Sequence, residues 1–135
     1  MLGIVWIIQL VHYPSFHFVD TSNYRSFQNF HIKRISIIVV PVMIIEALSG
    51  LIYLIYFIKN IEVFFLASMM LLIVIWLMTG FIFSGLHQNL LIGYNRLTIN
   101  KLVSLNWIRT LLWSLRFFLL IISISIKFGY TFIIH

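Results

Sequence analysis

The 135-residue sequence contains no cysteine and only three acidic residues. Without cysteine, disulfides, iron–sulfur clusters and thiolate metal sites are excluded. Charged residues make up 9% of the chain, whereas a soluble domain has about 25%. A water-soluble fold is therefore close to excluded, because too few polar side chains exist to cover its surface. P-loop and dinucleotide-binding motifs and a His-x-x-x-His spacing are also missing.

The basic residues indicate a membrane rather than a nucleic acid. Nine Lys and Arg against three acids give a formal net charge of +6, which in a soluble protein would suggest nucleic acid. Here the basic residues flank long apolar runs, as topology signals beside an anionic membrane surface do. We therefore expect the lipid bilayer as a partner and no nucleic acid.

Four apolar segments fill most of the chain. Each has the length of a bilayer-spanning helix, about 17–25 residues, and none shows the alternation of a strand. In lipid every backbone polar group must be bonded internally, which favours helices despite the many β-branched residues. We predict an all-α fold, a four-transmembrane-helix antiparallel bundle that forms a single integral membrane domain over residues 1–135. The expected helices are 2–19, 35–58, 61–86 and 106–130.

The links between these segments differ in length and in charge. The link 20–34 contains Thr21 and Ser22 as candidate N-caps, so the second helix could begin outside the membrane. The link 59–60 predicts a tight antiparallel pair of helices. The longer link 87–105 is amphipathic, and we expect it along the membrane interface.

The two long links contain most of the basic residues, namely Arg25, Lys33, Arg34, Arg96 and Lys101, with Arg109 opening the fourth helix. The opposite side has only Lys59 and Lys127. The positive-inside rule then places both long links in the cytoplasm and both termini outside. We expect His135 to be a solvated chain end.

Polar residues inside membrane helices are costly, and each is a functional hypothesis. At about 1.5 Å per residue, Gln9, Glu46 and Arg116 are each predicted roughly 15 Å from the cytoplasmic surface. His12, Thr79 and Trp113 are predicted about 10 Å from it. Two helical stripes carry the polar side chains, namely Gln9, His12, Tyr13 and Phe16, and Asn106, Arg109, Trp113 and Arg116.

These positions predict a polar pocket that opens to the cytoplasm and is floored by Glu46, Arg116 and Gln9. An unpaired charge at that depth would be expensive, so we expect Glu46 and Arg116 to pair. His12 is the candidate catalytic ligand or acid–base, with Glu46 and Arg116 tuning its charge or anchoring substrate. The candidate substrate-binding residues are Gln9, Tyr13, His31, Arg34, Arg109 and Trp113.

A metal or haem site is a further hypothesis, because imidazoles from separate helices can meet in a bundle. His12, His31 and His87 are its candidate ligands, and neutral imidazole suits haem iron and other transition metals. Each feature also has a structural alternative: the Glu46–Arg116 pair could only fix helix packing, and the histidines could be interfacial residues. Small residues indicate close helix packing at two places, Ala47 with Gly50 and Gly80 with Ser84.

Several stretches resemble a family of small, uncharacterised four-helix bacterial membrane proteins. They are 6–16 (WIIQLVHYPSF), 30–34 (FHIKR), 41–46 (PVMIIE) and 106–116 (NWIRTLLWSLR). The resemblance covers nearly the whole chain and implies the fold and a place in the bacterial inner membrane, but no activity. The layout is also similar to the HemJ-type protoporphyrinogen oxidases, which bind haem, and to anthrone-oxygenase-like proteins. The chain lacks the Leu-Pro-Arg element that follows the first-helix histidine in the HemJ type.

Three functions of different classes stay open at this point. The first is a membrane oxidoreductase acting on an apolar or aromatic, porphyrin-like small molecule, with haem or a transition metal as its cofactor. The second is a non-catalytic membrane subunit or scaffold. The third is a small proton-coupled transporter, working as a homo-oligomer, in which Glu46 is the proton or cation site. The apolar outer half of the predicted bundle argues against the transporter.

Overall fold

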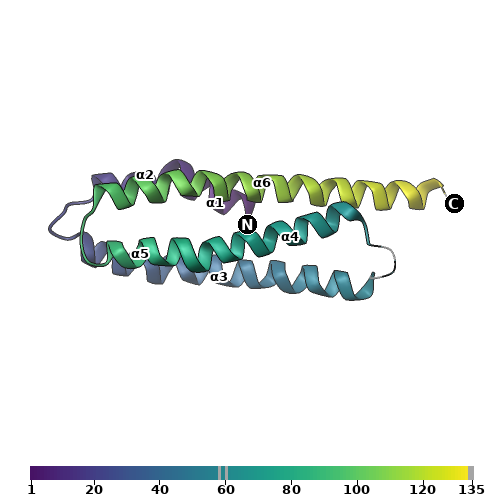
Figure 1. Cartoon of the computed structure of the whole chain (residues 1–135), viewed down its shortest axis with the longest axis horizontal. Helices are drawn as coiled ribbons and strands as arrows, with labels where there is room; N and C mark the ends of the chain where they lie inside the picture. The colour runs from purple at the N-terminus through teal and green to yellow at the C-terminus, as the bar shows by residue number, and fades with distance from the viewer. Residues whose placement is uncertain (58, 60, 134–135) are drawn as a thin grey trace.

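The computed structural model describes residues 1–57, 59 and 61–133 and is a bundle of helices (Figure 1). No strand occurs within that part of the chain, so the all-α prediction is confirmed for it. The elements in chain order are α1 (Leu2–Ile7), the π-helical η1 (Ile8–His12), α2 (Tyr13–Ser15), the 3₁₀ turn η2 (Phe16–Phe18), α3 (Tyr24–Tyr56), α4 (Val63–Leu77), the π-helical η4 (Met78–Phe83), α5 (Ser84–Leu90) and α6 (Arg96–Ile133).

Three of the four predicted spans are long and apolar enough to cross a membrane, which suggests a membrane protein. They are α3, the continuous run Val63–Leu90 formed by α4, η4 and α5, and α6 as far as Lys127. The first segment, from α1 to η2, is shorter and is not among them. Its Met1 end lies near the middle of the long axis of the bundle (Figure 1). The prediction had placed the N-terminus at an end of the bundle, outside the membrane.

Two helices begin about ten residues earlier than predicted. α3 begins at Tyr24 instead of residue 35, and α6 begins at Arg96 instead of residue 106. For α3 the candidate N-caps in the link 20–34 had allowed this earlier start. The predicted start of α6 was wrong because it was set by an apolar run, whereas a helix continues as long as one face stays buried. In α6 that face carries Ile99 and Leu102, both fully buried, and the Asn95 side chain accepts a hydrogen bond from the Thr98 amide at 3.0 Å. Because α6 occupies most of the link 87–105, the predicted interfacial segment does not exist.

The start of α3 also differs from the predicted N-cap. The residue before the helix is Asn23, while Thr21 and Ser22 lie in the preceding turn. The Ser22 hydroxyl donates to Asp20 at 2.7 Å and its amide donates at 3.1 Å. These two hydrogen bonds favour the charged carboxylate and hold the pKa of Asp20 below its usual value.

α4, α5 and the first segment pack against α6. α4 lies along the C-terminal half of α6, and α1, η1 and α2 lie along its N-terminal half (Figure 1). Two apolar clusters fill the interior, and in lipid they stabilise the bundle by van der Waals packing. The inner cluster includes Phe16, Tyr24, Phe83, Leu90 and Leu102, and the middle cluster consists of Val5, Met43, Leu72, Ile75 and Trp113.

The predicted close-packing positions are confirmed at one place and wrong at another. A Cβ atom on Gly50 would lie 2.7 Å from Sδ of Met69, so α3 and α4 are in close contact there. The rings of Tyr53 and Phe65 extend that contact, with centroids 4.4 Å apart. Gly80 has nothing within 4 Å of such a Cβ and holds no helices together.

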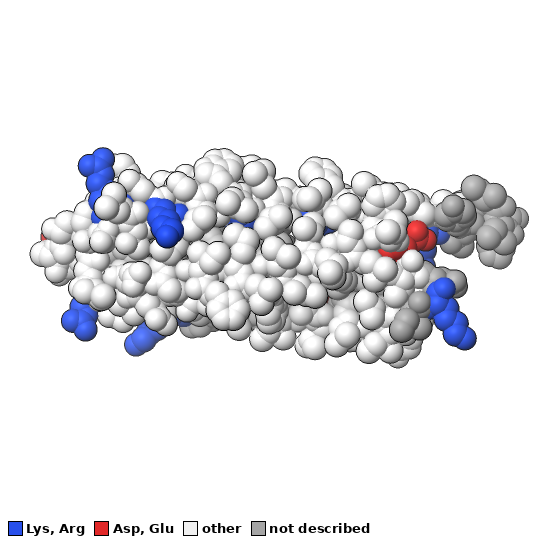
Figure 2. Space-filling model, viewed as in Figure 1, with Lys and Arg blue, Asp and Glu red and all other residues white. Residues whose placement is uncertain are grey.

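Most basic side chains visible in Figure 2 lie toward the end where α5 is followed by α6, and the surface between the two ends is almost uncharged. This distribution agrees with the charge asymmetry on which the predicted orientation rests, and the cytoplasmic side itself stays a prediction. Three predicted positions lie outside the described residues: residue 58 as the end of the second span, Asn60 in the short link, and the chain end at His135.

The absence of cysteine makes the orientation directly measurable. We expect Thr21→Cys and Asn100→Cys to react with a membrane-impermeant maleimide only after bacterial cells are permeabilised, because both are exposed at the basic end of the bundle. Lys59→Cys should react in intact cells, and Ser68→Cys, which is buried, should react in neither. Labelling of Thr21→Cys in intact cells would reverse the orientation.

Candidate functional site

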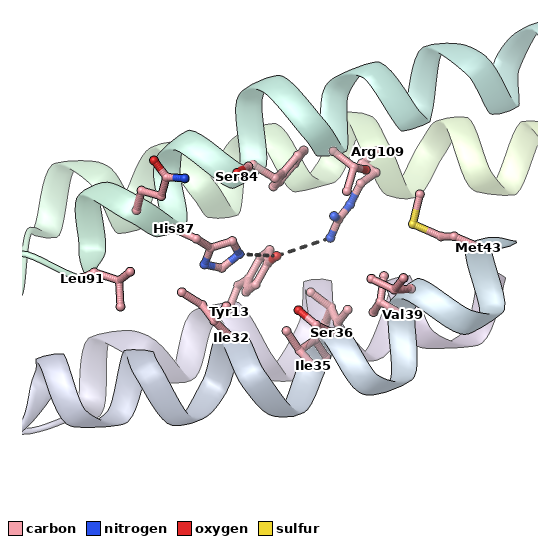
Figure 3. Close-up of a pocket in the computed structure, with 15 residues that line it drawn as sticks. Tyr13, Ile32, Ile35, Ser36, Val39, Met43, Ser84, His87, Leu91 and Arg109 are labelled. Carbon is pink, nitrogen blue, oxygen red and sulfur yellow. Dashed lines mark hydrogen bonds between the residues drawn. The ribbon is translucent and has the colours of Figure 1, made fainter.

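A pocket of about 390 Å³ lies between α3 and the η4–α5 stretch, in the half of the bundle that also contains the first segment (Figure 3). Its wall is mostly aliphatic, with Ile8, Ile32, Ile35, Val39, Met43 and Leu91. Its polar side chains are Tyr13, Ser36, Thr79, Ser84, His87, Gln88 and Arg109. A largely apolar cavity with a few convergent polar groups is typical of a small-molecule site.

Two π-helical turns border this pocket. η1 directly precedes Tyr13, and η4 contributes Thr79 and Phe83 to the wall. A π turn is often found at a functional site, because the wider turn redirects side chains relative to an α-helix. In the first segment, Gln9 lies within the π turn and contacts α6, and Tyr13 directly after it lines the pocket.

Arg109 is a buried cation at one end of the pocket, with 5% of its surface exposed. Its guanidinium lies over the ring of Phe83 at 4.2 Å, and Nη2 donates to the hydroxyl of Tyr13 at 3.4 Å. Its Nε is buried without a hydrogen-bond partner. Within the described part of the chain no carboxylate lies within 4.0 Å of it, since the ion pairs found there all involve Glu46.

The hydroxyl of Tyr13 lies between Arg109 and His87 (Figure 3). It is 3.1 Å from Nε2 of His87, and Nδ1 of His87 is 2.8 Å from the amide nitrogen of Gln28. Tyr13 and Gln28 are both buried. Side chains from α2, α3, α5 and α6 therefore meet in one hydrogen-bonded group at the polar end of the pocket.

His12 and His31 form a second polar contact beside this group. Nε2 of His12 is 2.8 Å from Nδ1 of His31, and the ring of His31 is 5.2 Å from that of His87. Thus the three predicted metal ligands are neighbours. Both nitrogens of His87 and one each of His12 and His31 are in these contacts, while Nε2 of His31 is buried without a hydrogen-bond partner. In the described chain no three His, Asp or Glu side chains are placed to hold a metal ion. The predicted metal or haem site has no support from this geometry.

The predicted pair of Glu46 and Arg116 is confirmed. Nη1 of Arg116 is 3.1 Å from one carboxylate oxygen of Glu46, and the amino group of Met1 is 2.9 Å from the other. Both residues line a smaller cavity of about 190 Å³ between α3, α4 and α6. Arg116 also lies over the ring of Trp113 at 5.3 Å.

Gln9 is not at this level, although the prediction placed it there. Its side-chain oxygen accepts from Asn106 at 2.7 Å, and its amide donates to the Val103 carbonyl at 3.4 Å. Gln9 was counted from residue 19 and Arg116 from residue 106, and because α6 begins ten residues earlier than residue 106, Arg116 lies further along the bundle than that count placed it. The first segment therefore packs closer to the start of α6.

The predicted single chamber is in fact two separate sites. His12 lies with His31, while Glu46 and Arg116 line the smaller cavity, so the three candidate catalytic residues do not meet. Trp113 is buried in the middle apolar cluster. Of the predicted substrate-binding residues, Tyr13 and Arg109 line the pocket; His31 is buried beside them, and Arg34 is exposed against Phe30.

Sequence reasoning missed Gln28 and Phe83. Gln28 was assigned to a link outside the membrane, although Tyr24, Gln28 and His31 follow the helical spacing i, i+4, i+7 and are all buried. Phe83 was one of many apolar residues, and only the structure shows that Arg109 lies on its ring.

Comparisons of this chain with protein-family models, with curated proteins and with solved structures found no match. The geometry of the site is therefore the basis for inferring its function.

The ion pair at Glu46 predicts unequal losses of stability. Glu46→Gln removes the anion from two cations and should lower the free energy of unfolding in detergent by about 2 kcal/mol, below the figure for fully buried pairs because Glu46 is 23% exposed. We expect the double variant Glu46→Gln/Arg116→Gln to be more stable than Glu46→Gln alone, as an SDS-unfolding series would measure. Glu62→Gln is the control, and equal losses in the single and double variants would contradict the coupling.

Proposed function

We propose that this chain is a membrane protein that binds an amphiphilic molecule in the pocket between α3 and α5, with an anionic head at Arg109. The observation that carries this proposal is the missing counter-ion of Arg109. A buried charge is normally paired, and an unpaired one costs several kcal/mol. The face of Phe83 and one hydroxyl compensate only part of that cost, so the pocket is suited to a ligand that brings the negative charge.

The rest of the pocket suits an apolar body. Its wall is aliphatic and its volume lies within the usual range for small-molecule sites, about 300–1,000 Å³. Ser36, Val40, Ser84 and Gln88 line it and are exposed on the side of the bundle, between α3 and α5. An amphiphile in the adjoining leaflet, which the charge asymmetry makes the cytoplasmic one, would therefore reach Arg109 without leaving the membrane.

The sequence motifs agree with this location of the site. The stretch 6–16 contains Tyr13, and the stretch 106–116 contains Asn106 and Arg109. We propose that the chain belongs with the small four-helix bacterial membrane proteins that it resembles, in the inner membrane. In that case the motifs that carry the resemblance also supply the polar end of the pocket.

A membrane oxidoreductase acting on an apolar or aromatic molecule is the second candidate. The observation that favours it is the group of rings around the head position: the ring centroids of Tyr13, His31 and His87 are 5.2–6.4 Å apart, and these side chains offer groups for proton transfer. The absorption spectrum and metal content of the purified protein test the haem or metal version. A Soret band that is lost in His12→Ala would support it, and a colourless, metal-free protein would remove it.

The other two functions have weaker support. A scaffold explains the Glu46–Arg116 pair, but it gives no reason to bury Arg109 without an anion. For a transporter with Glu46 as its proton or cation site, Glu46 would have to be available, whereas both of its carboxylate oxygens are in ion pairs.

The proposal predicts that Arg109 determines the binding of anionic amphiphiles. In nanodiscs of phosphatidylcholine, the fluorescent fatty acid dansyl-undecanoic acid should bind the wild-type protein, and Arg109→Gln should weaken that binding at least tenfold, since a charged hydrogen bond is worth about 1.5–3 kcal/mol. Arg34→Gln, which changes an exposed arginine of α3, should have no effect.

The binding of an uncharged amphiphile, dodecanol, should be insensitive to Arg109→Gln. Binding of the fatty acid that is equal in the wild-type protein and Arg109→Gln would refute the proposal, provided that thermal unfolding shows both variants folded. Lipid extraction and mass spectrometry of the purified protein offer an independent check, because a stoichiometric anionic amphiphile should be lost with Arg109.

A further inference from the structure

The hydrogen bonds of His87 determine its charge and tautomer. An amide nitrogen donates only, so Nδ1 of His87, 2.8 Å from Nε2 of Gln28, accepts a hydrogen bond. The proton of the neutral imidazole is then on Nε2, which donates to the Tyr13 oxygen at 3.1 Å. His87 thus adds no positive charge to the pocket.

These hydrogen bonds leave the hydroxyl proton of Tyr13 without an acceptor among the described residues. Its oxygen accepts from His87 on one side and from Nη2 of Arg109, at 3.4 Å, on the other. With both acceptor positions used, the O–H must point in a third direction, and no acceptor for it is found among the described residues. Tyr13 lines the pocket, so its hydroxyl is a donor available to a ligand there.

The charge of the pocket limits the charge of its ligand. Arg109 is the one charged side chain among the described residues that line it. A head with one negative charge leaves the pocket neutral, whereas a phosphate monoester, close to a dianion at neutral pH, would leave a negative charge in an apolar site.

We infer that the pocket selects an amphiphilic monocarboxylate, with one oxygen on the guanidinium of Arg109 and the other accepting the proton of Tyr13. This inference rests on the proposed function and adds the class of the ligand. Tyr13 is then the specificity-determining residue: it distinguishes a strongly accepting carboxylate from a sulfate ester, which has the same charge and is a weaker acceptor. An alcohol has no charge to offer to Arg109.

The test compares four heads on one twelve-carbon chain. Dodecanoate, dodecyl phosphate, dodecyl sulfate and dodecanol each displace dansyl-undecanoic acid from the protein in phosphatidylcholine nanodiscs, with the affinity of the probe measured for every variant. In the wild-type protein we expect dodecanoate to bind about tenfold more tightly than dodecyl phosphate or dodecanol. Tyr13→Phe should weaken the binding of dodecanoate about tenfold and the binding of dodecyl sulfate less than threefold.

Tyr24→Phe is the matched control. Tyr24 is also a buried tyrosine whose hydroxyl has no partner, but it does not line the pocket, so its affinities should equal those of the wild-type protein. A uniform loss for all four heads in Tyr13→Phe would show a structural role and overturn the inference. Dodecyl phosphate binding as tightly as dodecanoate would overturn it too.

A second readout keeps the inference testable if Tyr13→Phe is less stable. The ¹³C carboxyl shift of labelled dodecanoate bound to the wild-type protein should differ from that in Tyr13→Phe, because one hydrogen bond is lost, and identical shifts would count against the inference. Failure of the proposed function is distinguishable, since in that case none of the anionic compounds binds, or Arg109→Gln binds them as tightly as the wild-type protein.

Discussion

The structure depends above all on how a membrane protein keeps a guanidinium inside an apolar bundle. Arg109 lies on the face of Phe83, touches the hydroxyl of Tyr13 and has no carboxylate beside it in the described chain. In a low-dielectric interior an unpaired cation raises the free energy of the protein, and a nearby anion would lower it. The guanidinium of Arg109 can be reached from the pocket that it lines. The apolar wall, the side opening and the neutral His87 all agree with the proposed binding of an anionic amphiphile at Arg109.

α6 carries a second arginine inside the bundle, and this one is paired. Arg116 lies two turns beyond Arg109 and forms an ion pair with Glu46, and Trp113 is buried between the two arginines. The paired Arg116 links α6 to α3 through Glu46, and the unpaired Arg109 lines the pocket. One helix face therefore carries both a structural ion pair and the proposed binding group, separated by a layer of apolar side chains.

The helical class and the pairing of Glu46 with Arg116 followed from the sequence, because both rest on a strong rule: uncompensated polar groups are expensive in lipid. The start of α6 did not follow, and that of α3 was indicated only by its candidate N-caps, since both starts are set by buried faces that continue beyond the apolar runs. The error in α6 placed Arg116 at the level of Gln9, whose partner in the structure is Asn106.

The candidate site shows the same limit. Tyr13 and Arg109 were identified as binding residues from their polarity and helical spacing, but their counterparts Gln28 and Phe83 depend on three-dimensional contact alone. The predicted cluster of His12, His31 and His87 does exist as a set of neighbours. Its hydrogen-bond directions, which decide against metal ligation among the described residues, are invisible in a sequence.

The π turn η1 has a consequence for how the first segment can vary. Such a turn is equivalent to an α-helix with one extra residue, so it shifts the angular phase of the helix before it relative to the helix after it. Trp6, which contacts α6 through Ser114, and Tyr13, which faces the pocket, are thus oriented by separate stretches of helix. Deleting a single residue between them would rotate one stretch against the other by about a quarter turn, so the Trp6–Ser114 hydrogen bond and the position of Tyr13 in the pocket could no longer both be kept.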